Sequence, residues 1–431
     1  MERKVLIITY YWPPSGGSGV QRWLKFVKYL PGFGWEPYVF TPENPSFAIQ
    51  DNSLVSDVPK EAEIIRIPIW EPYNAFMKFS ALVGRNKSIK PTELVSGEQK
   101  SLFQKVSGWI RGNFFIPDPR VFWVKPSVRF LHDFLRENKI NTIVTTGPPH
   151  SMHLIGFKLK KKNPSIKWVA DFRDPWSEWG LLDSLMVGKI AHNIHRKLEA
   201  KVLRYADVVT TITPFYVRRF EELSGRTVSL LTNGYDHEDF ESFTIHRKNK
   251  FVIRHVGTVN EKCNPRPFML AVQQLAAGNA DFSSFVQVDF VGDVHPQFKA
   301  YVVSTPGISK FTTFTAPVPH NELLTMYGQS SLLLIILTGY KDAAGYMPGK
   351  LFEYLATGLP VLGTGPEQGD TANLLKEHGI GRIIDEHKTD EIKRQLLEVF
   401  LDWMAEKPFN SRKSATGYSR KELTRQLTEL L

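Results

Sequence analysis

A lysine and a glutamate follow a proline and two glycines in the stretch from Gly345 to Glu353, where a helix is expected to begin. The glycines permit close approach of a backbone to a ligand, and a proline suits the first helical turn because its missing N–H is not needed there. The free N–H groups of a helix start attract anions, and Lys350 adds a full charge. Glu353 lies three residues later on nearly the same face, where its carboxylate could accept hydrogen bonds from two ribose hydroxyls. The spacing predicts a binding site, with an ordinary surface Lys–Glu pair as the alternative.

A second candidate site is the loop YYWPPSGGSG at residues 10–19, directly after the first apolar run. Gly16 and Gly17 would bring the backbone close to a ligand at the carboxyl end of a strand, where open α/β sheets bind their ligands. The loop matches neither the GxGxxG fingerprint nor the GxxxxGK[ST] phosphate loop, so NAD and ATP are disfavoured. A tight turn before a helix is the structural alternative.

Two further predicted strands end in side chains that could transfer protons or bind hydroxyls. His150 and His153 follow a Gly-Pro-Pro loop, and a functional and a structural role are equally compatible with that placement. The next strand ends in Asp171, Arg173 and Asp174, which could bind sugar hydroxyls or supply a base. An internal Asp–Arg pair that shapes the loop is the alternative, and the Asp-x-x-Asp spacing does not make a metal site.

The second half of the chain offers two cations near the end of its first predicted strand. Lys262 or Arg266 could neutralise a phosphate group there, whereas a solvated loop lysine is the commoner case. Both interpretations stay open from the sequence.

Short apolar runs alternate with helical patterns throughout, which places these residues at strand ends. This rhythm is typical of parallel sheets covered on both faces, so we expect an α/β protein with two doubly wound sheets. The expected strands are 4–9, 36–40, 141–146, 167–171, 207–213, 251–257, 287–292, 310–314, 331–337, 360–363 and 381–384, and the expected helices include 20–30, 190–205, 321–327, 350–356 and 419–431.

The same pattern predicts the domain organisation. A first domain at 1–230 is followed by a linker at 231–250 that contains an Asn-Gly turn signal, and then by a second domain at 251–405. Leucines at helical spacing near the end predict a helix within 406–431 that packs on one of the domains. The irregular stretch from 71 to 125, dense in Phe and Trp, is a candidate functional loop region.

Composition narrows the class of protein. The 431 residues are 42% hydrophobic and include one cysteine, Cys263, which predicts a globular protein without internal disulfides and favours the cytoplasm. No apolar run is long enough to span a membrane, and no leader is expected. The net charge of +10 divides into +13 for residues 1–220 and −3 for the remainder. An anionic membrane surface or substrate is therefore favoured over nucleic acid, for which no accompanying signature occurs.

Two Rossmann-like halves, the glycine loop, the Asn-Gly turn and the segment PGKLFEYLATGLPV resemble the GT-B glycosyltransferases. The likeness is to the large retaining family that includes bacterial polysaccharide and lipopolysaccharide enzymes, covers essentially the whole chain and is strongest over 331–363. It implies two Rossmann-like domains facing a central cleft, with acceptor bound by the first and nucleotide sugar by the second. Domain closure would complete the site, and the last helix would cross back onto the first domain.

The resemblance implies roles for single residues. Glu353 is similar to the family's ribose-binding glutamate, His150 to a histidine near the transferred sugar, and the loop at Gly16 and Gly17 to one that approaches the donor phosphates. The catalytic residues expected are His150, Asp174 and Lys262; the donor-binding residues expected are Gly16, Gly17, Lys262, Arg266, Gly345, Tyr346, Met347, Pro348, Gly349, Lys350, Leu351 and Glu353; the acceptor-binding residues expected are Asp171, Arg173 and Trp176.

Two positions depart from the family pattern. A second glutamate is often found where this chain has Gly345, so the contact to the sugar ring must be supplied elsewhere. An arginine common in the family is replaced by Thr258, which shifts the phosphate role to Lys262 or Arg266.

The implied reaction is a hexosyltransferase reaction that moves a sugar from UDP or GDP to an acceptor hydroxyl with retention, in cell-surface polysaccharide synthesis. Lys262, Lys350 and the helix start would stabilise the departing diphosphate. No cofactor or metal ion is expected, and the expected partners are a nucleotide sugar and a glycan or lipid-linked acceptor. A nucleotide-sugar 2-epimerase and a non-catalytic sugar-nucleotide binding protein are the alternatives.

The basic first half would suit a place at the inner face of the plasma membrane. Aromatic and basic residues of the irregular stretch could rest on anionic lipid, or the aromatics could pack under a long loop. The residues concerned are Trp109, Arg111, Phe114, Phe115, Arg120, Phe122, Trp123 and Lys125.

Overall fold

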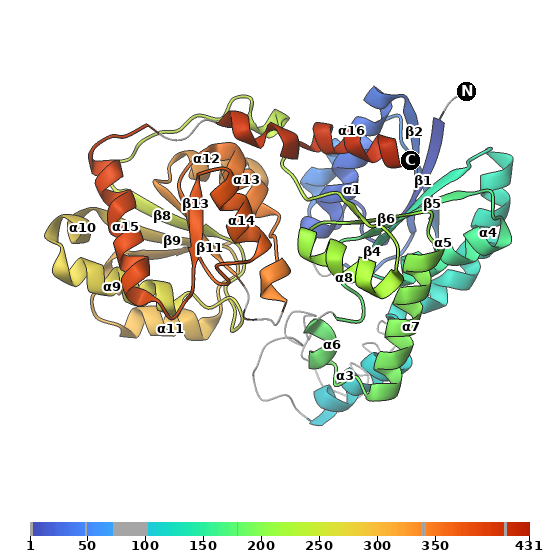
Figure 1. The fold of residues 1–431 in the computed structure, drawn as a ribbon, viewed down its shortest axis with the longest axis horizontal. Helices are drawn as coiled ribbons and strands as arrows, with labels where there is room; N and C mark the ends of the chain where they lie inside the picture. The colour runs from blue at the N-terminus through green and yellow to red at the C-terminus, as the bar shows by residue number, and fades with distance from the viewer. Residues whose placement is uncertain are drawn as a thin grey trace. The chain divides into compact units, whose positions relative to one another are not determined.

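The computed structural model describes residues 3–47, 50–71, 102–178, 180–337, 339, 342–408 and 412–431. The chain divides into two compact units, of which the first combines Met1–Asn233 with Arg420–Leu431 and the second is Gly234–Ser419. Each unit is a parallel sheet with helices on both faces (Figure 1).

The described part of the first unit holds a seven-stranded sheet in the order β3-β2-β1-β4-β5-β6-β7. The order of connection reverses between β1 and β4, which are neighbours in the sheet and pair Val5 with Thr142. The strands are β1 Arg3–Ile8, β2 Trp35–Pro42, β3 Glu63–Ile67, β4 Thr142–Gly147, β5 Lys167–Phe172, β6 Val208–Thr211 and β7 Ser229–Leu230.

Helices bury both faces of this sheet. Val5 and Ile7 pack with α1 and α16, whereas Leu6 and Ile8 belong to the core formed with α4, α5, α7 and α8. Successive side chains of β1 therefore point to opposite cores, which explains its continuous apolar sequence. The helices are α1 Ser18–Tyr29, α3 Leu102–Phe114, α4 Val124–Glu137, α5 Ser151–Lys162, α6 Gly180–Ser184, α7 Lys189–Tyr205, α8 Pro214–Ser224 and α16 Arg420–Leu430.

The second unit repeats this plan with a six-stranded sheet in the order β10-β9-β8-β11-β12-β13, and its reversal lies between β8 and β11. One face packs against α9, α10, α11 and α15, and the other against α12, α13 and α14. The strands are β8 Phe251–Val256, β9 Val286–Val291, β10 Thr312–Thr315, β11 Leu332–Ile336, β12 Val361–Thr364 and β13 Gly381–Ile384. The helices are α9 Arg266–Gly278, α10 Ala280–Phe285, α11 Pro296–Ser304, α12 His320–Gly328, α13 Lys350–Thr357, α14 Asp370–Glu377 and α15 Thr389–Met404.

The predicted α/β class with two doubly wound sheets is confirmed. Most expected strands and helices differ from the observed ones by one or two residues, but the edge strand β3 was not predicted. The stretch 231–250, expected to be a linker, divides at Asn233, and its later part belongs to the second unit. Phe240 and Phe243 explain this because both side chains are buried in the core with α13.

Candidate functional site

The first candidate site lies where the strand order of the second unit reverses. The segments that follow β8 and β11 leave the sheet there, at the carboxyl ends of the strands, where open α/β sheets bind ligands. The two segments contact each other, because the N–H of Gly339 donates to the carbonyl of Lys262 at 2.8 Å. The helix α13 begins beside them.

The helix α13 is fixed by glycines at both ends and by an apolar face. Gly349 is its N-cap, and Gly358 ends it with a φ of 71°, a conformation that favours glycine. Pro348 does not occupy the first helical turn as predicted, since the helix begins at Lys350. Pro348 instead supplies a carbonyl that accepts from the N–H of Leu351 at 3.0 Å.

Lys350 points back across the crevice to the end of β8. Its Nζ donates to the carbonyl of Val256 at 2.7 Å and lies 3.5 Å from Nε2 of His255. Nδ1 of His255 lies 3.0 Å from the carbonyl of Leu334, so Nδ1 carries the proton and Nε2 turns a lone pair towards the ammonium group. Burial, reinforced by the charge of Lys350, lowers the pKa of His255 well below its usual value, which keeps the ring neutral.

The ammonium group of Lys350 lies in a tight, partly desolvated place. Burial lowers the pKa of Lys350 to about 8, against the opposite influence of Cys263 and Glu353. Gly257 makes room for it, since a Cβ at that position would lie 3.0 Å from Nζ, and its φ of 129° is a conformation that L side chains rarely adopt. Near neutral pH the lysine is mostly charged, so a phosphate oxygen would complete its coordination.

Glu353 is held in place by side chains that are distant in sequence. The hydroxyl of Tyr327 donates to Oε2 of Glu353 at 2.9 Å, and Oε1 lies 3.9 Å from Nδ1 of His320. Nε2 of His320 lies 3.2 Å from Oδ2 of Asp239. Burial and the charge of Glu353 raise the pKa of Tyr327, so it remains a donor. Tyr327, His320 and Asp239 were not predicted from the sequence, and no local pattern marks them.

Several of the residues predicted to bind the donor do not offer it a free side chain. Met347 and Leu351 are buried in the core of the second unit, so only their backbones could meet a ligand. Tyr346 is exposed, and its carbonyl accepts from the hydroxyl of Thr371 at 2.6 Å. Gly345 closes a short 3-10 turn, with its N–H bonded to a backbone carbonyl.

The two candidate phosphate cations lie in different surroundings. Lys262 is exposed on the β8–α9 loop, where its N–H donates to Oδ1 of Asn260 at 2.8 Å. Arg266 is the first residue of α9, and its guanidinium lies 4.9 Å from the ring centre of Tyr301 and 3.4 Å from the carbonyl of Gln297, both on α11. The contacts of Arg266 with α11 disfavour it as the companion of Lys350.

The second candidate site lies at the strand reversal of the first unit, where Arg173 joins α1 to the end of β4. Its Nη1 donates to the carbonyl of Gly19 at 2.8 Å, its Nε to that of Gly147 at 3.2 Å, and its Nη2 to that of Pro148. Gly19 is needed because a Cβ there would lie 2.6 Å from Nη1. The guanidinium therefore ties the first turn of α1 to the end of β4 and the loop that follows it, which does not support the predicted contact with an acceptor.

Asp171 lies within the sheet rather than at its surface. Its fully buried carboxylate accepts from Arg22 at 2.8 and 3.2 Å and from Nε1 of Trp23 at 2.7 Å. The hydroxyls of Thr146 and Thr210 donate to it at 3.1 and 2.8 Å. Burial alone would raise the pKa of Asp171, but the charge and hydrogen bonds of Arg22 outweigh it and hold the pKa at about 2. This arrangement leaves no room for an acceptor hydroxyl and favours a structural role.

His150 and Trp176 form a buried aromatic stack. Their ring centres are 5.2 Å apart with planes inclined by 3°, and Nε1 of Trp176 donates to Nδ1 of His195 at 2.9 Å. Burial, together with the nearby charges of His153 and Arg173, lowers the pKa of His150 well below its usual value. His150 is therefore neutral at physiological pH. Both rings line a small cavity of about 50 Å³.

His153 and Asp174 flank that stack. Thr145 accepts from Nε1 of Trp168, so its hydroxyl proton is donated to Nδ1 of His153 at 2.9 Å. Burial lowers the pKa of His153 to about 3, which suits a structural role. Asp174 is partly exposed beside Arg173, so it is the predicted carboxylate that solvent can reach.

The glycine loop of the first unit forms the start of α1. Gly17 is the N-cap with a φ of 94° and is exposed, while Gly16 is partly exposed. The N–H of Ser15 donates to the carbonyl of Trp12 at 3.0 Å, which makes a tight turn before the helix. A ligand at this helix start and a plain turn remain equally compatible with this geometry.

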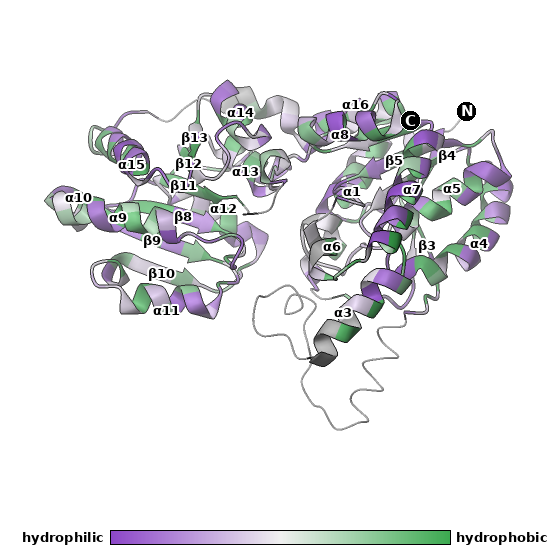
Figure 2. Ribbon diagram, turned by 60° about the horizontal axis from the view of Figure 1, so that its bottom comes forward, coloured by the Kyte–Doolittle hydropathy of each residue, from purple (hydrophilic) through white to green (hydrophobic). Residues whose placement is uncertain are grey.

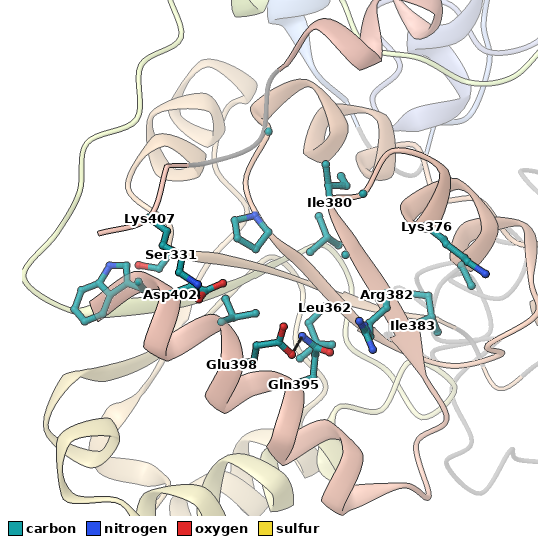
Figure 3. A pocket seen from close by; sticks show the side chains of 18 of the residues that line it. Ser331, Leu362, Lys376, Ile380, Arg382, Ile383, Gln395, Glu398, Asp402 and Lys407 are labelled. Atoms are coloured by element: carbon teal, nitrogen blue, oxygen red, sulfur yellow. Dashed lines mark hydrogen bonds and ion pairs between the residues drawn. The ribbon is translucent and has the colours of Figure 1, made fainter. Parts of the chain in front are cut away.

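A larger pocket of about 650 Å³ lies at the opposite edge of the second sheet (Figure 3). Ser331, Val361 and Gly381 line it at or beside the amino ends of β11, β12 and β13, with Glu398 and Asp402 of α15 nearby. Ligands of open α/β sheets bind at the carboxyl ends, so this pocket is not part of the candidate site.

Two other kinds of site are absent from the described residues. No group of three or more His, Cys, Asp and Glu side chains there could hold a metal ion. No helix in the described part of the chain is long and apolar enough to cross a membrane.

Comparisons with solved structures identify the fold. Sucrose-phosphate synthase from Thermosynechococcus elongatus superposes with a TM-score of 0.62 at 14% identity, covering 99% of this chain and 98% of that chain. WaaG, a glycosyltransferase involved in lipopolysaccharide biosynthesis, gives a TM-score of 0.57 at 15% identity over 99% of each chain. A putative UDP-N-acetylglucosamine 2-epimerase from Listeria monocytogenes gives 0.55 at 10% identity over 99% of this chain and 95% of that chain.

The two doubly wound units and these likenesses show that the chain has the GT-B fold, as the resemblance in sequence predicted. No protein-family model matches the sequence, and a search of curated proteins found no match. At such low identities the likeness establishes the fold, while the activity must be argued from the site.

Proposed function

We propose that the protein is a glycosyltransferase that moves a hexosyl group from a UDP- or GDP-sugar to a hydroxyl of a glycan or lipid-linked acceptor, with retention of configuration. The observation that carries this proposal is the pairing of Lys350 with the end of β8 at the strand reversal, one turn before the immobilised Glu353. A cation and a carboxylate three residues apart match the diphosphate and the ribose of a nucleotide sugar.

In this proposal, Lys350 and Lys262 bind the diphosphate and stabilise its charge as it leaves. The first N–H groups of α13 add to this because a helix start lacks intrahelical partners for them. Glu353 accepts from the ribose hydroxyls through the carboxylate that Tyr327 orients. The reaction needs no cofactor or metal ion in this scheme.

The first unit would then supply the acceptor side of the reaction. Asp174 is our candidate base because it is the carboxylate of its loop that solvent reaches. His150 would act as a neutral hydrogen-bonding group, since the low pKa of His150 excludes a cationic role near pH 7. Arg173 and Asp171 would hold α1 against the sheet rather than bind the acceptor.

The test is a two-stage assay on the full chain. A thermal-shift screen of UDP- and GDP-sugars comes first, because a ligand that binds the native state raises the melting temperature. The stabilising donor is then incubated alone and with glycan or lipid-linked acceptors, and released nucleotide diphosphate and product sugar are measured. Transfer or donor hydrolysis supports the proposal. Sugar interconversion would indicate an epimerase, and binding without turnover a non-catalytic protein.

The cellular setting is also a proposal. A cytoplasmic enzyme at the inner face of the plasma membrane, acting in cell-surface polysaccharide synthesis, would meet both a soluble nucleotide sugar and a lipid-linked acceptor. The basic charge of the first 220 residues supports this setting.

A further inference from the structure

The helix α3 of the first unit has its apolar stripe on the outside. Val106, Trp109, Ile110 and Phe114 follow the spacing of one helix face, yet all four are exposed, Phe114 at 69%. The opposite side of the helix is buried at Gly112, where a Cβ would lie 2.9 Å from the carbonyl of Leu185. An amphipathic helix normally buries such a stripe, and an exposed one typically marks a surface that binds a membrane or another protein.

The start of α7 extends the apolar surface. Asn113 of α3 fixes the junction, since its Oδ1 accepts from the N–H of Gly188 at 2.8 Å and its Nδ2 donates to the carbonyl of Met186 at 3.2 Å. Ile190 and Ile194 lie one turn apart on α7, and Ile190 is 80% exposed. Figures 1 and 2 show α3 and α7 side by side, with apolar turns on α3 and mainly hydrophilic turns on α7. We call the residues Val106, Trp109, Ile110, Phe114, Met186, Ile190 and Ile194 the α3–α7 patch.

The exposed charges that α7 itself adds next to the α3–α7 patch are basic. Within a turn of Ile194, α7 becomes basic and exposes Arg196, Lys197, Lys201 and Arg204. The carboxylate on α7, that of Glu199, is buried and accepts from backbone N–H groups at 2.9 and 3.0 Å. The sequence of α3 contains no acidic residue at all. Glu222 of α8 lies beside these cations and offsets them only in part, since it is one carboxylate against four basic side chains. An exposed apolar stripe bordered by such a basic cluster is complementary to anionic lipid, whose headgroups attract the charges while the aromatic and aliphatic side chains enter the interface.

We propose that the α3–α7 patch is a docking surface for an anionic membrane, with Trp109, Phe114 and Ile190 inserted and Arg196 and Lys197 at the headgroups. This deepens the proposed function, because it says where an enzyme with a lipid-linked acceptor contacts the bilayer. It also changes the surface expected from the sequence. Trp123, which the sequence placed in that surface, is buried and stacks on Phe40, and the Nε of Arg120 is paired with Glu71 at 3.0 Å.

The test is flotation of the full-length protein with vesicles of phosphatidylcholine alone or with about 30% phosphatidylglycerol. We expect binding to the anionic vesicles and little to the neutral ones, with weaker binding in high salt. Two double variants, Phe114→Ser/Ile190→Ser and Arg196→Glu/Lys197→Glu, should each weaken vesicle partitioning by roughly tenfold or more. The matched controls, Val303→Ser for an exposed aliphatic residue and Lys310→Glu/Arg382→Glu for two exposed cations of the second unit, should stay within about twofold.

Two control measurements on each variant show that it is folded: its melting temperature, and its binding of the stabilising nucleotide sugar by calorimetry. Unchanged flotation of both patch variants would overturn the proposal, as would equal binding to neutral vesicles. Failure to float, combined with light scattering that shows a dimer dissociated by the patch variants, would assign the patch to a second copy of the chain instead. A protein that floats but binds no nucleotide sugar would refute the proposed function and leave the docking surface standing.

Discussion

The two units share one topology but use their strand reversals differently. In the first unit, Arg173 bonds to three backbone carbonyls and His150 is stacked on Trp176, so these groups already have protein partners or are neutral. In the second unit, Lys350 and Glu353 reach the same structural position while keeping their charges near a partly exposed surface. The same fold therefore gives a strand reversal with a structural role in the first unit and one that presents a lysine and a glutamate to a ligand in the second.

This difference shows that the strand order determines where a site lies and that the burial of its side chains determines its chemistry. Arg173 and Lys350 are both cations at strand reversals. The guanidinium of Arg173 donates to three backbone carbonyls, whereas Lys350 contacts one carbonyl and one neutral histidine. Variants in the two crevices should accordingly affect stability in the first unit and ligand binding in the second.

The largest effect is expected from Asp171→Ala at the strand reversal of the first unit, and it should lower the free energy of unfolding. This change leaves Arg22 buried without its carboxylate, and breaking a buried pair by removing one partner costs about 3–5 kcal/mol. Urea unfolding followed by tryptophan fluorescence would measure it. Asp133→Ala, whose ion pair on α4 is exposed, should change the free energy of unfolding by less than about 1 kcal/mol. A loss below that value for Asp171→Ala would contradict its structural role.

The next largest effect is expected from Glu353→Gln at the strand reversal of the second unit, and it concerns affinity for the nucleotide sugar. The amide can still accept from Tyr327, but it loses the negative charge that strengthens hydrogen bonds from ribose hydroxyls. Since hydrogen bonds to charged groups contribute about 1.5–3 kcal/mol, we expect affinity for the nucleotide sugar to fall by roughly 10- to 100-fold in calorimetry. The control is Glu377→Gln, an exposed position on α14. Equal affinities of wild type and Glu353→Gln would remove Glu353 from the site.

Gly257→Ala should act on both stability and binding. The positive φ and the 3.0 Å approach to Lys350 together predict a loss of about 1–2 kcal/mol in the free energy of unfolding. Displacement of Nζ should also weaken nucleotide-sugar binding. Gly278→Ala is the matched change, because a Cβ there would meet no atom within 4 Å and its backbone is not in the positive-φ region. Identical stability of the two alanine variants would contradict the packing described for Lys350.

The smallest effect is a pH dependence that belongs to Lys350. Because the pKa of Lys350 is about 8, raising the pH from 7 to 9 should remove most of its charge and weaken nucleotide-sugar binding by at most about tenfold. Lys350→Met should bind more weakly at pH 7 and lose this dependence. A wild-type affinity that is flat across this range would show that the ammonium group does not contact the phosphates.

The same pKa has a consequence for stability. The unfolded chain binds a proton on Lys350 up to about pH 10.5 and the folded chain only up to about pH 8, so folding releases a proton between these values. The free energy of unfolding of the wild type should therefore rise with pH across that window relative to Lys350→Met. Urea titrations at about pH 7.5 and about pH 9.5 measure the difference, and a fall would show that burial does not lower the pKa of Lys350.

Much of the fold follows from local patterns. Continuous apolar runs such as residues 332–337 predict strands buried on both faces, and the observed β11 differs from the expected range 331–337 by one residue at each end. The helix α13 was predicted at 350–356 from its glycines and apolar face, and it begins at Lys350 as expected, with Pro348 before its first turn. The edge strand β3 escaped prediction because only part of its surface is buried, which weakens its apolar signal.

The site was predicted less completely than the fold. Lys350 and Glu353 were found because their spacing places them on one helical face, a consequence of covalent geometry. His255, Tyr327 and His320 were missed, since they lie between 26 and 95 residues from their partners on α13. Contacts between residues so far apart in the chain produce no periodic pattern in the local sequence.

The sequence by itself determined the α/β class, the two doubly wound halves and the helix that carries a lysine and a glutamate, because backbone hydrogen bonding and apolar periodicity act over a few residues. Only the tertiary structure decided that Asp171 and Arg173 hold α1 against the sheet, that His150 is neutral, and that the apolar stripe of α3 faces outward. These properties depend on burial and on the charges that surround each group, and both are set by the packing of segments that are distant in the chain.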